Sequence, residues 1–280
     1  MTGLRSPGAT RDATTPGCTR ATKRPLLPPP FPAVVIQLIQ QMQDPDAGAA
    51  DVGKLIELDP ALTASLLRLV NSPFFGMRRQ IAGVSEAVMV LGMSAVRRMV
   101  MSLAVAVPLR QAGVDAEFAR IRWHHTVSCA ALARRLIVDD PAAAELAFTA
   151  GLLHDIGQVD LLHRHGAAYV ALHAEAGTGD VRPLEVQRFG QAHDVLGAEL
   201  MESWGLPAAI ADAARHHHAP PPIAGLSRVQ QAVWLANRLA GTPEQAAQAL
   251  PLAPDTLAPP AQAVAEARAE IDTLASLLNG

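Results

Sequence analysis

The amino-acid sequence predicts an all-α protein, and three observations support that prediction. Half of the 280 residues are hydrophobic, so the chain can bury a sizeable core. Alanine and leucine dominate the composition while aromatic residues make up only 4%, which favours packed helices over sheets. Along most of the chain, apolar residues recur at the i, i+3, i+4 spacing of one buried helix face.

The N-terminal part of the chain divides into a tail and a series of short helices. Residues 1–24 are rich in Thr, Arg, Pro and Gly, and we expect a flexible tail there because this composition cannot offset the entropy of ordering. The proline-rich residues 25–32 predict an extended lead-in. Short amphipathic helices then follow one another from about Ala33, and they predict a compact helical lobe over residues 25–110.

Residues 111–240 predict a second group of helices. The first of them is long and runs to about Val138, because apolar residues keep helical register that far. Prolines at first helical positions mark the starts of the others. These helices begin after Gly113, at Pro141, at Pro183 and after Pro207, and the second ends at Gly157.

Four histidines lie on the apolar faces of these four helices, and Asp155 directly follows the second of them. Imidazoles that point inward from separate helices can converge, and with a carboxylate they suit a divalent metal such as iron, manganese or zinc. A bound metal can lower the pKa of a water ligand to about 7 and so create hydroxide for phosphoester hydrolysis. The predicted metal ligands are His125, His154, Asp155, His193 and His217.

Five other histidines lack this placement, and we expect them to have a solvated surface role. They are His124, His163, His165, His173 and His216.

The last part of the chain, residues 241–280, predicts a C-terminal helical extension. Thr242 to Gln245 match a capping box, and a final amphipathic helix follows. Several prolines precede that last helix, so we expect it to be a loosely tethered appendage.

Charge and apolar patterning exclude some classes of partner. The formal net charge is only −3, and the basic pairs Arg97-Arg98 and Arg134-Arg135 stand without interleaved aromatics, which is typical of solvated faces or ion pairs. We therefore expect no nucleic-acid partner. The most apolar stretch, residues 87–109, is interrupted by the first of these pairs, so no membrane span is expected.

Cysteine usage favours a reducing compartment. Cys18 lies in the polar tail and Cys129 on the apolar face of a helix, so a disulfide between them is not expected. The N-terminus lacks the apolar core of a signal peptide. A cytoplasmic protein is the expectation.

Several short motifs occur in a fixed order between Leu27 and Asn237. They are Ile56 to Leu62, Leu67 to Ser72, Ala87 to Gly92, Gly151 to Gly157, Leu206-Pro207 and His217-His218. With these motifs the stretch resembles an HDOD domain, the regulatory relative of the HD-type metal-dependent phosphohydrolases of bacterial signalling proteins. The resemblance implies a two-lobed helical domain over residues 25–240, with an HD-like helical bundle in residues 111–240 and a role in protein-mediated regulation.

The sequence departs from catalytic relatives at three places. Asn237 stands at the position that best matches the late metal-binding aspartate of active HD phosphohydrolases, and an amide is a poorer ligand for a hard divalent metal. Gln158 stands where the cyclic-diguanylate phosphodiesterases of the HD-GYP class have a lysine. The Gly-Tyr-Pro signature of that class is absent after His218. Cyclic-dinucleotide hydrolysis is therefore not expected.

Three hypotheses about function follow. The first is a regulatory protein with a degenerate metal site and no catalysis, which transmits a signal by binding other signalling proteins or a small ligand between its lobes. The second is an active metal-dependent phosphohydrolase in which Asn237 is tolerated. The third is a module that senses metal or redox state without turnover.

Overall fold

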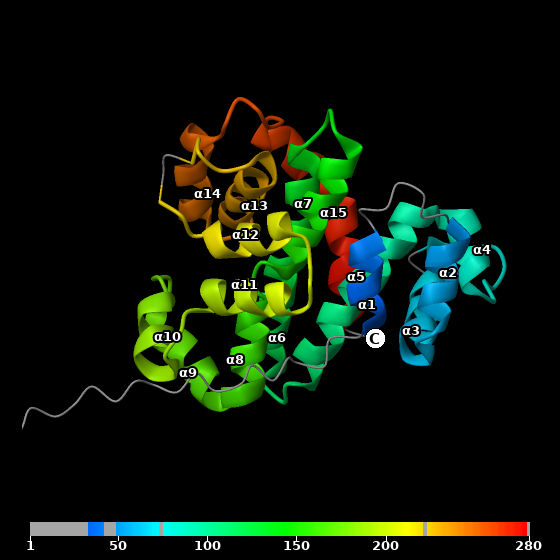
Figure 1. Ribbon diagram of the computed structural model, residues 1–280, viewed down its shortest axis with the longest axis horizontal. Helices are drawn as coiled ribbons and strands as arrows, with labels where there is room; N and C mark the ends of the chain where they lie inside the picture. The colour runs from blue at the N-terminus through cyan, green and yellow to red at the C-terminus, as the bar shows by residue number, and fades with distance from the viewer. Residues whose placement is uncertain (1–32, 42–48, 73–74, 221–222, 279–280) are drawn as a thin grey trace, which may run out of the picture.

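The computed structural model describes residues 33–41, 49–72, 75–220 and 223–278. Within these ranges every regular element is a helix and no strand is present, so the all-α prediction is confirmed (Figure 1). The tail predicted over residues 1–24, together with Cys18, lies outside the described residues.

The helices form two lobes joined by α5 (Met93–Gln111), as Figure 1 shows. At one end of the molecule lie α2 (Ala49–Glu57), α3 (Pro60–Val70) and α4 (Val84–Leu91). The first helix, α1 (Ala33–Gln41), packs against α2 and α5. This arrangement confirms the predicted two-lobed architecture.

Helix α3 shows how local sequence sets these elements. The Oδ1 atom of Asp59 accepts hydrogen bonds from the backbone N–H groups of Ala61 and Leu62, both at 3.0 Å, and Pro60 occupies the first helical position. The apolar face of the helix is buried, and its members are Leu62, Leu66, Leu69 and Val70.

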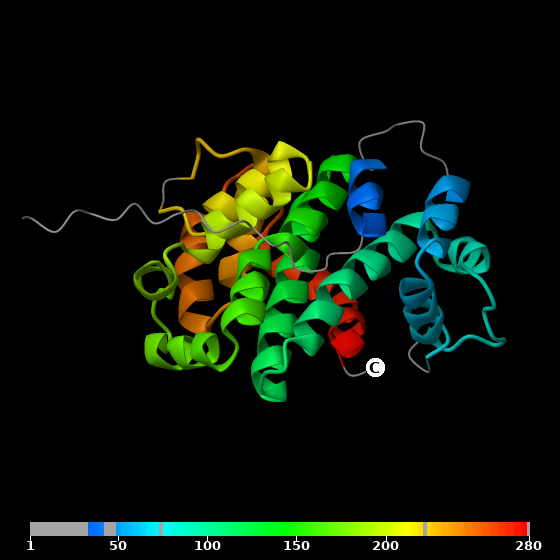
Figure 2. The ribbon, with the colours of Figure 1, turned by 60° about the horizontal axis from the view of Figure 1, so that its bottom comes forward.

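The second lobe is built around α6 (Ala116–Leu136), in which residues 126–133 are all buried. Three helices pack against it: α7 (Pro141–Leu153), α13 (Arg228–Leu239) and α15 (Pro260–Ala275) (Figure 2). The other elements of this lobe are α8 (Ile156–His165), α9 (Ala167–Ala176), α10 (Arg182–Phe189), α11 (His193–Ser203), α12 (Ala208–His216), α14 (Pro243–Ala249) and 3₁₀ turns at Leu250–Leu252 and Ser276–Leu278.

Two helix boundaries predicted from the sequence are wrong. The helix expected to end at Gly157 ends at Leu153, and a new helix, α8, begins at Ile156 with Asp155 at its N-cap position. The helix expected from Pro183 through His193 is two helices, α10 and α11. Its break is at Gly190, which adopts a left-handed conformation with φ of 87° that only glycine reaches at low cost.

The expectation of a loosely tethered C-terminal helix is also wrong. The indole N–H of Trp123 on α6 donates to the carbonyl of Leu274 on α15 at 2.9 Å, and both residues are buried. Glu270 on α15 accepts from Arg98 Nε at 2.9 Å and from Arg134 Nη2 at 2.7 Å. Arg98, Arg134 and Arg135 of the basic pairs thus serve as ion-pair partners, and α15 is tied to both α5 and α6. The division at residue 240 into a domain and an extension stays a prediction.

No helix in the described part of the chain combines the length and apolar character needed to cross a bilayer.

The Glu270 network predicts a stability difference between two neighbouring carboxylates. Glu270→Gln removes one of the two carboxylates that Arg98 and Arg134 share in a mostly buried site and leaves them only Glu145, so we expect a loss of about 2 kcal/mol in the free energy of unfolding. Glu266→Gln is the control, because Glu266 is 42% exposed and lies 3.6 Å from Arg135, and it should cost less than about 0.5 kcal/mol. Urea denaturation of both variants measures this, and equal effects would contradict the role given to Glu270.

Candidate metal centre

The five predicted ligands come together in the second lobe, at the ends of several helices. His125 lies in the middle of α6, while His154 and His217 directly follow the last residues of α7 and α12. His193 is the first residue of α11, and Asp155 stands at the N-cap of α8. All except His125 are buried, and the His125 side chain is 16% exposed.

The carboxylate of Asp155 lies at the centre of the imidazoles. Its Oδ1 atom is 3.3 Å from His193 Nε2 and 3.4 Å from His217 Nε2. Its Oδ2 atom is 3.3 Å from His154 Nε2 and 3.8 Å from His125 Nε2. The predicted convergence of four imidazoles and one carboxylate is therefore present in the structure.

Two glycines allow the helices to approach closely enough for this convergence. A Cβ atom on Gly157 would lie 2.1 Å from the carbonyl oxygen of His193, so only glycine lets the start of α8 sit against the start of α11. A Cβ atom on Gly151 would lie 2.9 Å from the Cα of Ala130. The absence of a side chain at Gly151 therefore lets α7 pack closely against α6. Gly151, His154-Asp155 and Gly157 thus act together as one structural motif.

The Nδ1 atom of each imidazole faces an acceptor, which leaves Nε2 directed at the centre. His154 Nδ1 contacts the carbonyl of Gly151 at 2.7 Å, and His217 Nδ1 contacts that of Ala214 at 2.5 Å. His125 Nδ1 lies 3.3 Å from the Ala240 carbonyl. Partners of this kind fix the tautomer and ring orientation of metal-binding histidines.

The acceptor for His193 is a buried carboxylate, Glu185 on α10. Its Oε2 atom accepts from the backbone N–H of His193 at 2.8 Å and from the ring Nδ1 at 2.7 Å. Its Oε1 atom accepts from the hydroxyl of Tyr169 at 2.6 Å. Sequence reasoning missed Glu185, because its position eight residues before His193 becomes meaningful only when the chain turns at Gly190.

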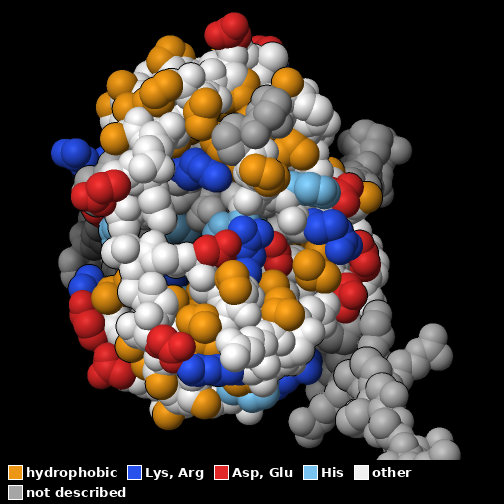
Figure 3. Space-filling view, turned by 90° about the vertical axis from the view of Figure 1, so that its left-hand side faces the viewer, with side chains coloured by type: hydrophobic (Ala, Val, Ile, Leu, Met, Phe, Trp, Pro, Cys, Tyr) orange, Lys and Arg blue, Asp and Glu red, His pale blue; other side chains and the backbone are white. Residues whose placement is uncertain are grey.

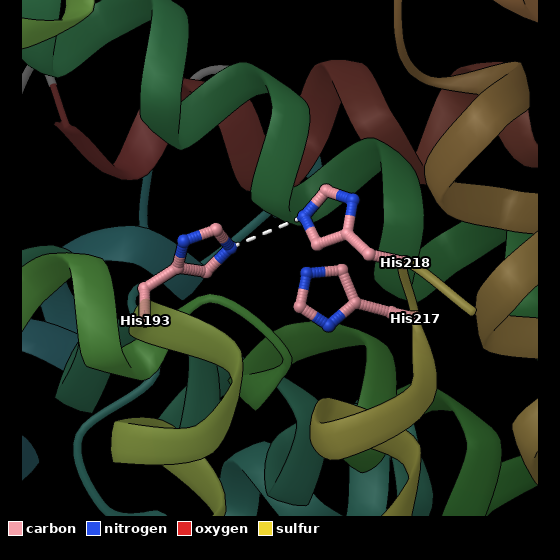
Figure 4. A group of neighbouring side chains, drawn as sticks. All are labelled: His193, His217 and His218. Carbon is pink, nitrogen blue, oxygen red and sulfur yellow. Dashed lines mark hydrogen bonds between the residues drawn. The ribbon is translucent and has the colours of Figure 1, made fainter. Parts of the chain in front are cut away.

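His218 is a further residue of the centre that sequence reasoning left without a role. Its Nε2 atom lies 3.2 Å from Nε2 of His193, and Figure 4 shows His193, His217 and His218 turned toward one another. These three form one group with metal-ligand spacing, and His125, His154 and Asp155 form another. The adjacent pair His217-His218 in the sequence was the available signal.

Electrostatics keep Asp155 ionised in spite of its burial. Burial favours the neutral acid, but the neighbouring His154 outweighs it and holds the pKa of Asp155 well below its usual range. Burial also opposes charge on His193, yet the nearby carboxylates of Asp155 and Glu185 raise its pKa to about 9. Burial dominates at His125 and His217 and lowers the pKa of each to about 4.

The donor geometry fits a metal ion. His154 Nε2, His217 Nε2 and Asp155 Oδ1 are buried without a hydrogen-bond partner, which is costly unless a cation takes that place. Donors about 2.1 Å from a metal, at angles between octahedral and tetrahedral, are about 3.0 to 3.4 Å apart. The separations of 3.3, 3.3 and 3.4 Å around Asp155 fall in that interval.

Asn237 also lies at the centre. Its Oδ1 atom is 3.0 Å from Nε2 of His125, and its amide nitrogen donates to the carbonyl of His217 at 3.3 Å. Asn237 stands at the position where the motif comparison expects the late metal-binding aspartate, and its amide faces the imidazoles. Neutral His125 has acceptors at both ring nitrogens and can donate to only one of them, so a cation between His125 and Asn237 would satisfy both.

The remaining predicted surface histidines divide into two kinds. His124 and His163 are exposed as expected, whereas His165, His173 and His216 are half-buried, so the expectation of a solvated role is wrong for these three. His173 packs edge-on to the rings of Phe118 and Tyr169. Cys129 is a buried free thiol, in agreement with its predicted place in the core.

A cavity of about 750 Å³ opens onto this centre. Asp155, His125, His193, His218 and Asn237 contribute to its lining, together with residues of the α9–α10 connection and of α14. Figure 3 shows basic, acidic and histidine side chains around a hollow on this face of the molecule. The centre is therefore reachable by a small molecule from outside.

The family model described as HDOD domain matches residues 28–220. A curated relative, an uncharacterized protein from Treponema pallidum (strain Nichols), is 27% identical over 197 residues, which cover 69% of this chain. The match spans 38% of that relative's length.

Solved structures share the fold. A protein from Shewanella amazonensis SB2B, named provisionally as a phosphohydrolase, is 24% identical with a TM-score of 0.65, covering 89% of this chain and 94% of that one. An HDOD domain protein with unknown function from Geobacter sulfurreducens is 23% identical with a TM-score of 0.64, covering 89% and 92%. At these identities the likeness concerns the fold.

The geometry predicts that metal binding depends on His154 and not on a nearby exposed histidine. We expect His154→Ala to weaken Zn²⁺ binding at least about tenfold, because it removes a buried Nε2 donor directed at Asp155. His124→Ala is the control, because its ring is exposed although it adjoins His125. Competition titration with a chromophoric chelator measures both, and equal affinities for the two variants would rule out this centre.

Close packing at Gly157 predicts a large cost for a single methyl group. Gly157→Ala forces the backbones of α8 and α11 apart, so we expect a loss of about 3 kcal/mol in unfolding free energy and weaker metal binding. Gly225→Ala meets no atom within 4 Å and should be near neutral. Thermal denaturation of the metal-free proteins tests this, and a near-neutral Gly157→Ala would contradict it.

Proposed function

The chain belongs to the HDOD family, and from that premise we propose that it is a signal-transduction regulatory module whose HD-type centre binds a divalent metal without catalysing hydrolysis. Its output is the binding of other signalling proteins, and occupancy of the centre and of the adjoining cavity is its input.

The observation that carries this proposal is the amide of Asn237 beside His125. In the described part of the chain, Asp155 is the only carboxylate whose oxygens lie among the Nε2 atoms, because Glu185 faces the opposite nitrogen of His193. Hard metal ions that activate water for phosphoryl chemistry favour several anionic oxygen ligands. A centre with one carboxylate and four imidazoles favours retention of a borderline metal such as zinc or iron.

A bound divalent ion would supply a Lewis acid and would cross-link the lobe. The residues that would hold it are His125, His154, Asp155, His193 and His217, which come from five separate helices or helix ends. Because structural metal sites contribute their binding energy to folding, occupancy would stabilise the mutual placement of these helices. This coupling supports a role in which metal state changes the surface presented to partners.

Exposed apolar residues support a protein partner. Leu58, after α2, is 71% exposed, and Met89 and Val90 on α4 are 79% and 49% exposed. Contiguous exposed apolar surface marks interaction sites, whereas single exposed apolar residues are ordinary, and α2 and α4, which carry or adjoin these three residues, pack against each other. The N-terminal lobe is therefore the proposed surface for partner binding.

Active phosphohydrolysis is the second candidate. The observation in its favour is that the intact histidine–aspartate centre opens to a cavity that also has arginine side chains in its lining. In that case the metal would supply the Lewis acid, and Asn237 would be tolerated as a neutral neighbour.

The two candidates predict different results for hydrolysis by the wild-type protein, and Asn237→Asp tests the role given to the amide. We expect the wild-type protein to bind metal without hydrolysing bis-p-nitrophenyl phosphate, and Asn237→Asp to raise metal affinity about tenfold by adding an anionic oxygen beside His125. Gln248→Glu is the control, because it makes the same change of charge at an exposed position of the cavity lining.

Turnover by the wild-type protein that disappears in His154→Ala would overturn the regulatory proposal in favour of phosphohydrolysis. Equal metal affinities for Asn237→Asp and Gln248→Glu would contradict the claim that the amide of Asn237 limits metal binding.

A further inference from the structure

The cavity above the metal centre is positively charged on a chain whose net charge is negative. Its lining contains four arginines but only two carboxylates, Asp155 and Asp180, whereas the whole chain carries a formal charge of −3. The arginines are Arg120, Arg122, Arg182 and Arg238.

Two of these arginines are already neutralised. Arg120 is paired with Glu117 at 2.5 Å, at an exposed position on the first turns of α6. Arg182 is paired with Asp180 at 2.7 Å and with Asp194 at 3.1 Å. Their charges are therefore largely compensated within the protein.

Arg122 and Arg238 have no ion pair in the described part of the chain. The Nε–H of Arg122 is buried without a hydrogen-bond partner. Arg122 lies one helical turn before His125 on α6, so its side chain is on the same side of the helix as the metal centre. The guanidinium carbon of Arg122 lies 6.0 Å from the centroid of the Phe118 ring, and the half-buried side chain forms part of the cavity wall. A guanidinium in a cavity wall with no carboxylate partner in the described part of the chain can pair with an anion from outside.

Arg238 is held in a fixed orientation. Its guanidinium carbon lies 3.7 Å from the centroid of the Trp234 ring, and its Nη1 donates to the carbonyl of His217 at 3.4 Å. Stacking and this bond immobilise the group before any ligand binds, which lowers the entropy cost of binding.

We propose that this cavity binds a small phosphate-bearing molecule of nucleotide size through Arg122 and Arg238. Guanidinium groups match phosphate oxygens in pairs, and a phosphate group carries enough charge for two of them. A volume of about 750 Å³ is in the range of ordinary small-molecule sites, and Thr178, Thr242 and Gln245 provide polar contacts at the lining. The role of this ligand as a signal rests on the proposed regulatory function. Its binding requires neither turnover nor a metal.

The test uses the full chain, freed of metal with EDTA, and two probes, ADP and inorganic pyrophosphate, in isothermal titration calorimetry. We expect at least one probe to bind, Arg122→Gln to weaken that binding at least tenfold, and Arg122→Lys to weaken it less because it keeps the charge. Arg110→Gln is the control, because Arg110 is exposed and outside the cavity, and it should change affinity less than twofold. Far-ultraviolet circular dichroism confirms that each variant is folded, and Arg122→Lys replaces Arg122→Gln if the latter is not.

Absence of binding for both probes would overturn the proposal. It would also be overturned if Arg110→Gln weakened binding as much as Arg122→Gln, or if citrate bound as tightly as the phosphate probes. Each result is separate from the test of the proposed function, because hydrolysis of a bound probe after reloading with metal would overturn the regulatory role and leave the anion site standing.

Discussion

The buried carboxylate of Asp155 organises the C-terminal lobe. Asp155 is ionised where little water reaches it, and an unpaired charge in such a place would strongly destabilise the fold. The raised pKa values of His154 and His193 let these two rings carry the compensating charge, and the rings of His125 and His217 complete the shell around the carboxylate. All four can reach it only if the middle of α6 and the ends of the other helices meet at one point. The glycines at 151 and 157, the break between α7 and α8 and the buried Glu185 are all consequences of that requirement.

Apolar periodicity was sufficient to predict the helices and their buried faces, because a helix has to bury its stripe whatever its neighbours are. The same periodicity placed His125, His154, His193 and His217 on inward faces, and the structure brings them together. The sequence pattern could not predict the break at Gly190, because a glycine inside a helical pattern is compatible with either a helix or a turn. Glu185 and His218 depend on that break and on the close approach of α11 and α12, so their roles required the tertiary structure.

The C-terminal helix shows a different limit of sequence reasoning. Prolines before α15 indicated a flexible connection, but they do not determine where the helix goes once it has formed. Its docking is determined by Trp123 and Glu270, whose partners are far away along the chain. Arg98 and Arg134, one from each basic pair of the sequence, anchor this helix as ion-pair partners of Glu270, and through Arg98 on α5 the helix links the two lobes.

The hydrogen bonds that orient the imidazoles are not alike in origin. His154 and His217 each face a carbonyl three residues earlier in their own helix, so their orientation is a local property of α7 and α12. His193 relies on Glu185 from α10, and His125 on Ala240 beyond the end of α13. His154 and His217 therefore keep their orientation as long as α7 and α12 are folded, whereas the orientation of His193 and His125 depends on contacts with other elements. A disturbance that loosens α10 or the segment after α13 would turn His193 and His125 away but leave His154 and His217 in place, so remote parts of the lobe can change the arrangement of the candidate ligands without touching them.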